Sequence, residues 1–396
     1  MSQPVRVLFS CSGVGIINRG IESFFREAFD GLKDTDGLDA RLVKGAGDPK
    51  EDEWVVRTLP RTGYTAPLLG KVARRNGYVV EQWSSFPGVV RRIRQFRPQI
   101  VFYSDSNLGF LLYWFRRQIG VPYRLLFSNG GPCGPPFVRT DFVHQVAPYY
   151  LDEAINFGES AERHFFVPYG IEVGAPPRTS PKERQRIRCQ LKLPLDRPIV
   201  LSVGWIARRH KRMDYVIEEM SRLPKPRPYL QLLGATDEES HEILSLGREL
   251  LGLDGFGAAS VPYEEVSNYY RAADAFVLAS LKEGVGRVYL EAMMHGLPVV
   301  AHRYPVSEFI LGRGGRMADL SRPCGLARAI QGVLSEAHEI SLAEERWRSV
   351  RDRFSWQVLA PQYMRMFRRA ASIGTPRAPS WTRYSKGSLN RVSSAL

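Results

Sequence analysis

The chain has 396 residues, 44% of them hydrophobic, which is enough for two domains of ordinary size with cores of their own. Its four cysteines lie far apart without metal-ligand spacing, no apolar run approaches the ~20 residues of a transmembrane helix, and the amino terminus lacks a signal-peptide layout. These features argue against a disulfide scaffold and a membrane-spanning protein, so we expect a cytoplasmic protein. Lysines and arginines exceed aspartates and glutamates by 55 to 41, and the net charge of +14 favours anionic partners without choosing among them.

The first predicted unit is a strand, a glycine-bearing loop and a helix. Residues 5–9 form an apolar strand, and the loop that follows holds Gly13 and Gly15. Apolar side chains then recur at helical spacing from Ile21 to Leu32. The glycines miss the Gly-x-Gly-x-x-Gly spacing of a dinucleotide fingerprint, so no such cofactor site is predicted.

Two segments farther along set aromatic side chains beside arginines, at residues 83–97 and 111–117. This composition is typical of segments that lie at the surface of an anionic membrane. A helix with an apolar core face and a solvated basic face fits each segment equally well. Both interpretations stay open; the first implies a peripheral contact with the cytoplasmic face of the membrane. No nucleic-acid partner is expected.

The first half continues with short apolar runs that predict strands. These runs occupy residues 100–103 and 124–128 and recur near residues 142–144. Residues 129–136 are rich in glycine and proline, so their composition predicts a loop.

Past a proline-bearing stretch at residues 174–181, which we interpret as a hinge, strands and helices alternate again. Strands are predicted at residues 199–204 and 229–233, and helices at residues 213–223 and 238–251. Alternation in both halves predicts an α/β protein of two doubly wound domains with a cleft between them.

The most informative stretch begins with an apolar run, residues 275–279, as expected for a strand buried on both faces of a parallel sheet. Gly284 and Gly286 permit a tight turn in which backbone approaches a ligand. Residues 287–295 predict a helix, which ends at Gly296, and a strand resumes at residues 299–301.

Glu283 and Glu291 flank this turn. Glu283 lies at the carboxyl end of a strand, where open α/β sheets bind ligands, and Glu291 lies on the second turn of the helix. Free amides at a helix start bind anions such as a diphosphate, and ionised carboxylates accept hydrogen bonds from sugar hydroxyls. The alternative is a surface helix with two solvated glutamates; the glycine turn and the buried strand favour a ligand site.

The spacing from Glu283 to Glu291 resembles the Glu-x7-Glu signature of the family-4 retaining glycosyltransferases, which have the GT-B fold. The resemblance extends over most of the chain. It includes residues 19–22, 166–172, 269–274, 307–310 and 354–369.

It implies two doubly wound, Rossmann-like domains facing across a cleft. Residues 1–172 would form an acceptor-side domain and residues 173–360 a domain that binds the nucleotide sugar. Residues 361–372 would form a helix that crosses back to the first domain. Residues 373–396 lack apolar periodicity and predict a disordered basic tail.

The resemblance implies catalytic roles for Glu283, which contacts the sugar, and for Lys211, which stabilises charge on the leaving diphosphate. Glu291 would bind ribose. The family often has an arginine directly after the glycine at 204; this chain has Trp205, so Arg208 or Arg209 would supply the second cation. The implied donor-binding residues are Gly13, Gly15, Gly204, Arg208, Arg209, Lys211, Gly284, Val285, Gly286 and Glu291.

On the acceptor side, Asn129 and its neighbouring glycines are the stronger candidates. His144 fits either a position facing the cleft or a place in the core. The remaining histidines show no paired metal-ligand spacing, so neither a metal site nor a cofactor beyond the donor is predicted.

The leading hypothesis is therefore a retaining, metal-independent transfer of a hexosyl unit from a nucleotide diphosphate sugar to a glycan or lipid-linked acceptor, in the synthesis of a surface polysaccharide or glycolipid. Two alternatives stay open. One is a nucleotide-sugar epimerase on the same scaffold. The other is a non-catalytic basic binder of membranes or nucleic acid that retains a degenerate sugar site.

Overall fold

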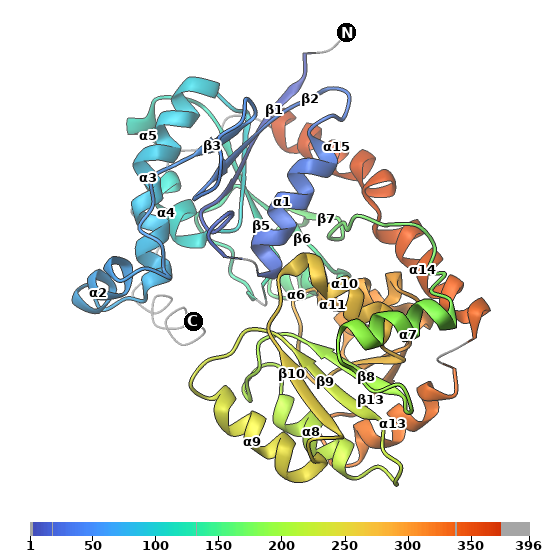
Figure 1. Cartoon of the computed structure of the whole chain (residues 1–396). Helices are drawn as coiled ribbons and strands as arrows, with labels where there is room; N and C mark the ends of the chain where they lie inside the picture. Colours follow the sequence, from blue (N-terminus) through green and yellow to red (C-terminus); the bar gives the residue numbers. More distant parts are fainter. Residues whose placement is uncertain (1–2, 18, 132, 337–338, 374–396) are drawn as a thin grey trace.

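The computed structural model describes residues 3–17, 19–131, 133–336 and 339–373, which fold into two α/β domains (Figure 1). The predicted basic tail therefore lies outside the described residues, apart from Ile373. None of the described helices is both long and apolar enough to cross a membrane.

The N-terminal domain is built on a seven-stranded sheet of order β3-β2-β1-β4-β5-β6-β7. All neighbouring strands in it pair in parallel. Its strands are β1 (Val5–Cys11), β2 (Leu38–Lys44), β3 (Glu53–Val55), β4 (Ile100–Tyr103), β5 (Arg124–Asn129), β6 (Phe142–Gln145) and β7 (His164–Phe166). Its helices are α1 (Gly20–Leu32), α2 (Thr65–Val72), α3 (Gly77–Phe96), α4 (Ser106–Trp114), α5 (Arg116–Ile119), α6 (Pro148–Asn156) and the 3-10 turn η1 (Ala161–Arg163).

The C-terminal domain repeats the pattern on a six-stranded parallel sheet of order β10-β9-β8-β11-β12-β13. Its strands are β8 (Ile199–Val203), β9 (Tyr229–Leu233), β10 (Phe256–Ala259), β11 (Ala275–Leu278), β12 (Val299–His302) and β13 (Gly315–Ala318). Its helices are α7 (Pro181–Gln190), α8 (Met213–Ser221), α9 (Ser240–Leu251), α10 (Tyr263–Ala272), α11 (Arg287–Met294), α12 (Pro305–Leu311), η2 (Gly312–Gly314), α13 (Gly325–Leu334) and α14 (Ile340–Phe354).

The last described helix, α15 (Trp356–Ser372), returns to the N-terminal domain. It packs beside α1 and against β1, β4 and β5, where Phe367 meets Phe9 and Phe102 edge to face (Figure 1). Because α14 belongs to the C-terminal domain, the pair α14 and α15 ties the two domains together.

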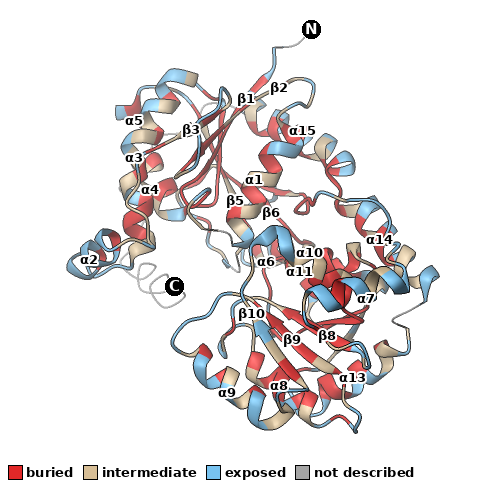
Figure 2. Cartoon of the chain, viewed as in Figure 1, coloured by how far each residue is buried: buried red, intermediate tan, exposed pale blue. Residues whose placement is uncertain are grey.

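Alternate side chains of each sheet point to opposite faces, and both faces are covered by helices. In β1, Phe9 joins the core formed with α1 and α15, whereas Leu8 joins the core formed with α3 and α4. In β8, the neighbouring residues Leu201 and Val200 likewise join different cores on the two faces of the sheet. Figure 2 shows the buried residues concentrated along both sheets. The predicted fold class, two doubly wound parallel sheets, is confirmed.

The two arginine-rich segments lie on α3 and on α4 with α5. Ile93 and Leu112 lie fully buried in the core under these helices, and Arg116 forms an ion pair with Asp141 at 2.6 Å. Arg91 and Arg117 are exposed. Both segments therefore have the apolar core face and the solvated basic face of the second interpretation.

Candidate functional site

The loop between β11 and α11 carries the first predicted catalytic residue, Glu283, whose side chain is buried. Gly284 lies against the N-terminal domain, since a Cβ there would come within 2.4 Å of the Gly130 carbonyl oxygen. Gly286 has a φ of +65° and caps α11. Only glycine makes a backbone contact as close as that of Gly284, and glycine adopts the positive φ of Gly286 without strain. The predicted turn is therefore also a contact between the domains.

Lys211 from the loop between β8 and α8 reaches Glu283. Its Nζ donates to Glu283 Oε1 at 2.6 Å, and His210 Nδ1 lies 3.9 Å from the same oxygen. The lysine stem packs over Gly204, where a Cβ would lie 3.1 Å from Lys211 Cε. Both loops follow strands that are neighbours in the sheet. The predicted catalytic pair is thus brought together at the carboxyl edge of β8 and β11.

The N-terminal domain reaches the same loop through Tyr150 on α6. Its hydroxyl donates to the main-chain oxygen of Glu283 at 2.9 Å. Burial raises the pKa of Tyr150 well above its usual value, so this hydroxyl keeps its proton. Sequence reasoning missed this residue, because nothing near Tyr150 in the chain marks it as a partner of residue 283.

Glu291 is buried on α11 beneath two tyrosines of α10. Tyr270 donates to its Oε2 at 2.9 Å and Tyr263 to its Oε1 at 3.3 Å. Burial, together with the charge of Glu291, raises the pKa of Tyr270. The carboxylate is therefore held in place by donors from its own domain, and its binding of ribose stays a prediction.

Arg287 at the start of α11 forms an ion pair across the domains with Glu27 of α1, at 2.5 Å. Burial opposes the charge of Arg287, but Glu27 and Glu291 outweigh it, so the pKa of Arg287 is raised. One of its nitrogens, Nη1, is buried without a hydrogen-bond partner in the described structure. Arg287 was not predicted, although its place directly after Gly286 was a signal.

Among the described residues, none of the arginines in the β8–α8 loop pairs with Glu283. Arg208 pairs with the exposed Glu242 of α9 at 3.1 Å, and Arg209 is exposed. Arg212 donates to the carbonyl of Leu320 at 2.6 Å and so fixes the end of the loop. Trp205, in the place of the usual arginine, donates to Asp237 at 2.9 Å. The choice between Arg208 and Arg209 as second cation stays open.

Gly13 and Gly15 shape the loop after β1. A Cβ on Gly13 would lie 2.5 Å from Glu22 Oε1 and 2.8 Å from Arg61 Nη2, and Gly15 has a φ of +82° with its Cα against the carbonyl of Ala46. The packing of the N-terminal domain itself therefore favours glycine at both positions. Their predicted contact with the donor remains a prediction.

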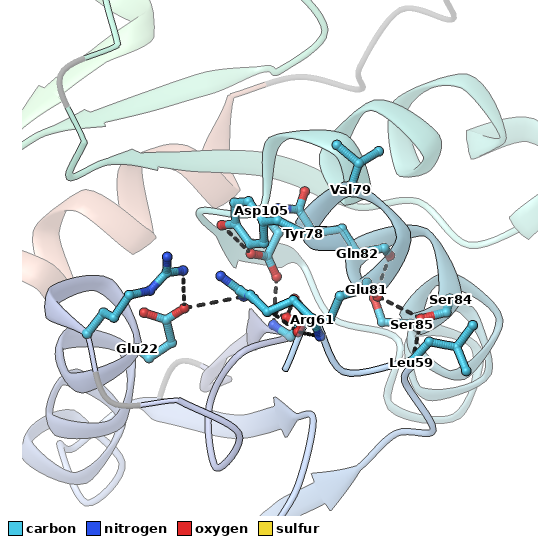
Figure 3. A network of polar contacts seen from close by, with 12 residues as sticks. Glu22, Leu59, Arg61, Tyr78, Val79, Glu81, Gln82, Ser84, Ser85 and Asp105 are labelled. Carbon is cyan, nitrogen blue, oxygen red and sulfur yellow. Dashed lines mark hydrogen bonds and ion pairs between the residues drawn. The ribbon is translucent and has the colours of Figure 1, made fainter. Parts of the chain in front are cut away.

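Glu22 and Arg61, the neighbours of Gly13, belong to a buried polar network that the sequence did not reveal (Figure 3). Arg61 holds Glu81 through its backbone amide at 2.8 Å, its Nε at 3.0 Å and its Nη2 at 2.6 Å. Ser12 donates its amide to Asp105 at 2.6 Å, and its hydroxyl lies 3.2 Å from Glu81. Burial, with a smaller effect of the Glu22 charge, raises the pKa of Asp105 to about 6.

The two acceptor-side candidates are buried. Asn129 donates to Gln145 at 2.9 Å and to the Cys133 carbonyl at 3.1 Å, although the neighbouring Gly130 does contact the Gly284 turn. His144 has no exposed surface, and its Nε2 lies 2.7 Å from the Val167 oxygen. Burial lowers the pKa of His144 to about 4, so the ring is neutral at pH 7. Of its two predicted positions, His144 occupies the one in the core.

No group of three or more potential metal ligands occurs among the residues that the structure describes.

The chain is similar in sequence to a known protein family and to several characterised glycosyltransferases. Residues 197–336 match the model of the glycosyl transferases group 1 family, which covers β8 to α13. The chain is 31% identical over 182 residues to the lipopolysaccharide core biosynthesis glycosyltransferase LpsE of Rhizobium meliloti, an alignment with 45% of this chain and 52% of that protein. It is 28% identical over 253 residues to a D-inositol 3-phosphate glycosyltransferase of Geodermatophilus obscurus, with 57% and 54% covered. The alignments thus span about half the length of these relatives.

Solved structures resemble more than nine-tenths of the chain. Sucrose-phosphate synthase from Thermosynechococcus elongatus superposes with a TM-score of 0.72 at 19% identity, over 92% of this chain and 98% of that one. HepE of Anabaena, solved with UDP-glucose, gives 0.71 at 16% identity, over 92% and 99%. At such identities the likeness establishes the fold. The chain therefore has the GT-B fold, and its residues 197–336 resemble the glycosyl transferases group 1 family.

Proposed function

We propose that the protein is a retaining glycosyltransferase that moves a hexosyl unit from a nucleotide diphosphate sugar to a hydroxyl of a glycan or lipid-linked acceptor. The observation that carries this proposal is the pair of Lys211 and Glu283, at 2.6 Å, beside the start of α11. A cation, free helix amides and a carboxylate at one edge of a parallel sheet suit a sugar diphosphate.

Each of these groups has a chemical task. Lys211 and the amides of residues 284–286 would bind the diphosphate and stabilise the charge that develops on it as the glycosidic bond breaks. Glu283 would accept hydrogen bonds from the sugar and orient Lys211. In a front-face attack, the acceptor oxygen bonds to the anomeric carbon while its proton passes to the leaving phosphate, so the configuration is retained without a protein nucleophile or a metal.

The contacts across the domains support closure as part of this reaction. Tyr150 and Glu27 of the N-terminal domain hold the loop and helix that carry the site. A closed pair of domains keeps water from the activated sugar and limits hydrolysis of the donor. A uridine diphosphate sugar is the first donor to test, since HepE was solved with UDP-glucose. The name of LpsE supports an acceptor in lipopolysaccharide synthesis, which would place the protein at the cytoplasmic face of the membrane.

Donor binding is tested with a panel of uridine, guanosine and adenosine diphosphate sugars. A ligand that binds the folded state raises the melting temperature, and one sugar of the panel should do so. Glu291→Gln should weaken that donor about tenfold or more, because an amide replaces a charged acceptor. Glu264→Gln, an exposed change on α10, is the matched control.

Turnover then separates the alternatives. A transferase releases nucleotide and joins the sugar to an acceptor, whereas an epimerase converts the donor without acceptor. A binder without enzymatic activity shows no turnover. Full activity of a folded Glu291→Gln protein would contradict the assigned role of Glu291.

A further inference from the structure

Helix α2 and the residues that flank it present a row of exposed apolar side chains. Tyr64 is 98% exposed, Leu68 64%, Leu69 47% and Val72 79%. Tyr64, Leu68 and Val72 follow at intervals of four, so they share one face of the helix, with Leu69 beside them. Large apolar side chains gathered on one short helix, rather than scattered singly, indicate an interaction surface.

The opposite face of α2 holds the helix on the protein. Ala66 and Gly70 are its buried residues, and a Cβ on Gly70 would lie 2.6 Å from the Arg75 carbonyl oxygen. This close packing joins α2 to the turn that starts α3. Figure 1 shows α2 projecting beyond the sheet of the N-terminal domain, and Figure 2 shows it almost entirely exposed. The apolar row therefore points away from the core.

The charge along this stretch of the chain is of one sign. Between Glu53 and Glu81 the sequence contains no acidic residue. The cations of this stretch are Arg57, Arg61, Lys71, Arg74 and Arg75. Arg61 is bound to Glu81, whereas Lys71, Arg74 and Arg75 are exposed and form no ion pair within the described part of the chain.

We propose that α2, with residues 64–75, is a membrane-docking element that inserts its apolar row into a bilayer containing anionic lipids. The combination of an apolar face and flanking cations on an amphipathic helix is what such a surface attracts. A second copy of the chain is a poorer partner, because it would bring the same cations together in a protein of net charge +14. Residues 83–97 and 111–117 contribute less, since Ile93 and Leu112 are fully buried in the core.

This inference goes beyond the proposed function, because docking on lipid requires no sugar transfer. If both hold, docking places the N-terminal domain at the surface where a lipid-linked acceptor resides. The two are separable, since vesicle binding and donor-induced melting shifts are different measurements.

The test is co-sedimentation of the full chain with vesicles of phosphatidylcholine alone and of phosphatidylcholine mixed with phosphatidylglycerol. We expect binding to the mixed vesicles that weakens as salt is added. The triple variant L68S/L69S/V72S should bind the mixed vesicles at least about tenfold more weakly than the unchanged chain. In the double variant K71Q/R75Q, the affinity for the mixed vesicles should fall about fivefold for each charge removed.

Matched controls carry the same changes on the C-terminal domain. The residues of L195S/L253S/I340S are similarly exposed, at 53%, 78% and 74%, and those of K182Q/R186Q are exposed on α7. Both controls should bind vesicles like the unchanged chain, and all variants should keep its melting temperature. Equal binding by the L68S/L69S/V72S variant, or no binding of the unchanged chain to mixed vesicles, would overturn the proposal. The proposal would also be overturned if light scattering showed the unchanged chain as a dimer and the L68S/L69S/V72S variant as a monomer. The apolar row would then be a contact between two copies of the chain.

Discussion

Both domains hold a buried glutamate against a cation near the carboxyl edge of a parallel sheet, yet the two arrangements differ in what else surrounds the pair. In the N-terminal domain, three donors of Arg61 converge on Glu81, which has no exposed surface (Figure 3). In the C-terminal domain, Lys211 donates to one oxygen of Glu283 beside the start of α11, where the N-cap residue Gly286 makes no side-chain cap. A buried carboxylate that is held by three donors of one arginine stabilises the fold, whereas a carboxylate that accepts one such bond can still accept hydrogen bonds from a ligand.

The largest expected effect is on turnover, from Lys211→Met. Loss of the cation should lower kcat about 10²- to 10³-fold, the usual result of removing one group that stabilises developing charge. Lys282→Met, an exposed neighbour of Glu283, should leave kcat unchanged. If Lys211→Met unfolded the protein but left the activity of the folded fraction intact, Lys211 would serve stability rather than catalysis.

The equivalent change in the N-terminal domain, Arg61→Met, should act on stability. It leaves the carboxylate of Glu81 buried without its ion pair, which costs about 3 kcal/mol or more of the free energy of unfolding. Urea denaturation measures this loss, and Arg57→Met, an exposed arginine of the same segment, is the control. A stable Arg61→Met protein with impaired donor binding would reverse the roles that we assign to the two networks.

Asp105 gives the N-terminal network a pH dependence. Its pKa is about 6 in the folded protein and about 3.9 in an unfolded chain, so the folded state binds the proton more tightly. The stability that this proton contributes is complete below about pH 4 and is lost as the pH rises through about 6. Between about pH 4 and 7, the unchanged protein should lose about 2–3 kcal/mol relative to Asp105→Asn, measured by urea denaturation. Parallel pH profiles of the two proteins would show that Asp105 titrates normally.

The smallest expected effect is that of Tyr150→Phe, which removes one hydrogen bond between the domains. A bond of this kind contributes about 1 kcal/mol, so kcat/KM should fall about fivefold while the melting temperature changes little. Tyr64→Phe, the same change at a tyrosine that is 98% exposed, serves as the comparison. If both variants behaved alike, the contact between Tyr150 and the Glu283 carbonyl would have no part in closure.

The sequence predicted those features that depend on neighbours in the chain. Periodicity and turn residues located the β-loop-α unit at 275–301 and the alternation of both domains, because burial on a sheet and a positive φ at Gly286 leave local signatures. The likeness of Glu283 and Glu291 to a known pattern then indicated the candidate site. The same local pattern also left two interpretations of the segments at 83–97 and 111–117, since a basic apolar helix looks alike at a membrane and on a sheet.

By itself, then, the sequence determined the α/β alternation, the glycine turn and the two glutamates that flank it. Only the tertiary structure decided that Tyr150 and Glu27 reach this unit from the other domain, that His144 lies in the core, and that α2 turns its apolar row outward. These contacts join residues more than a hundred positions apart or depend on which face of a helix is covered. Packing geometry sets them, and the spacing of residues along the chain carries no record of it.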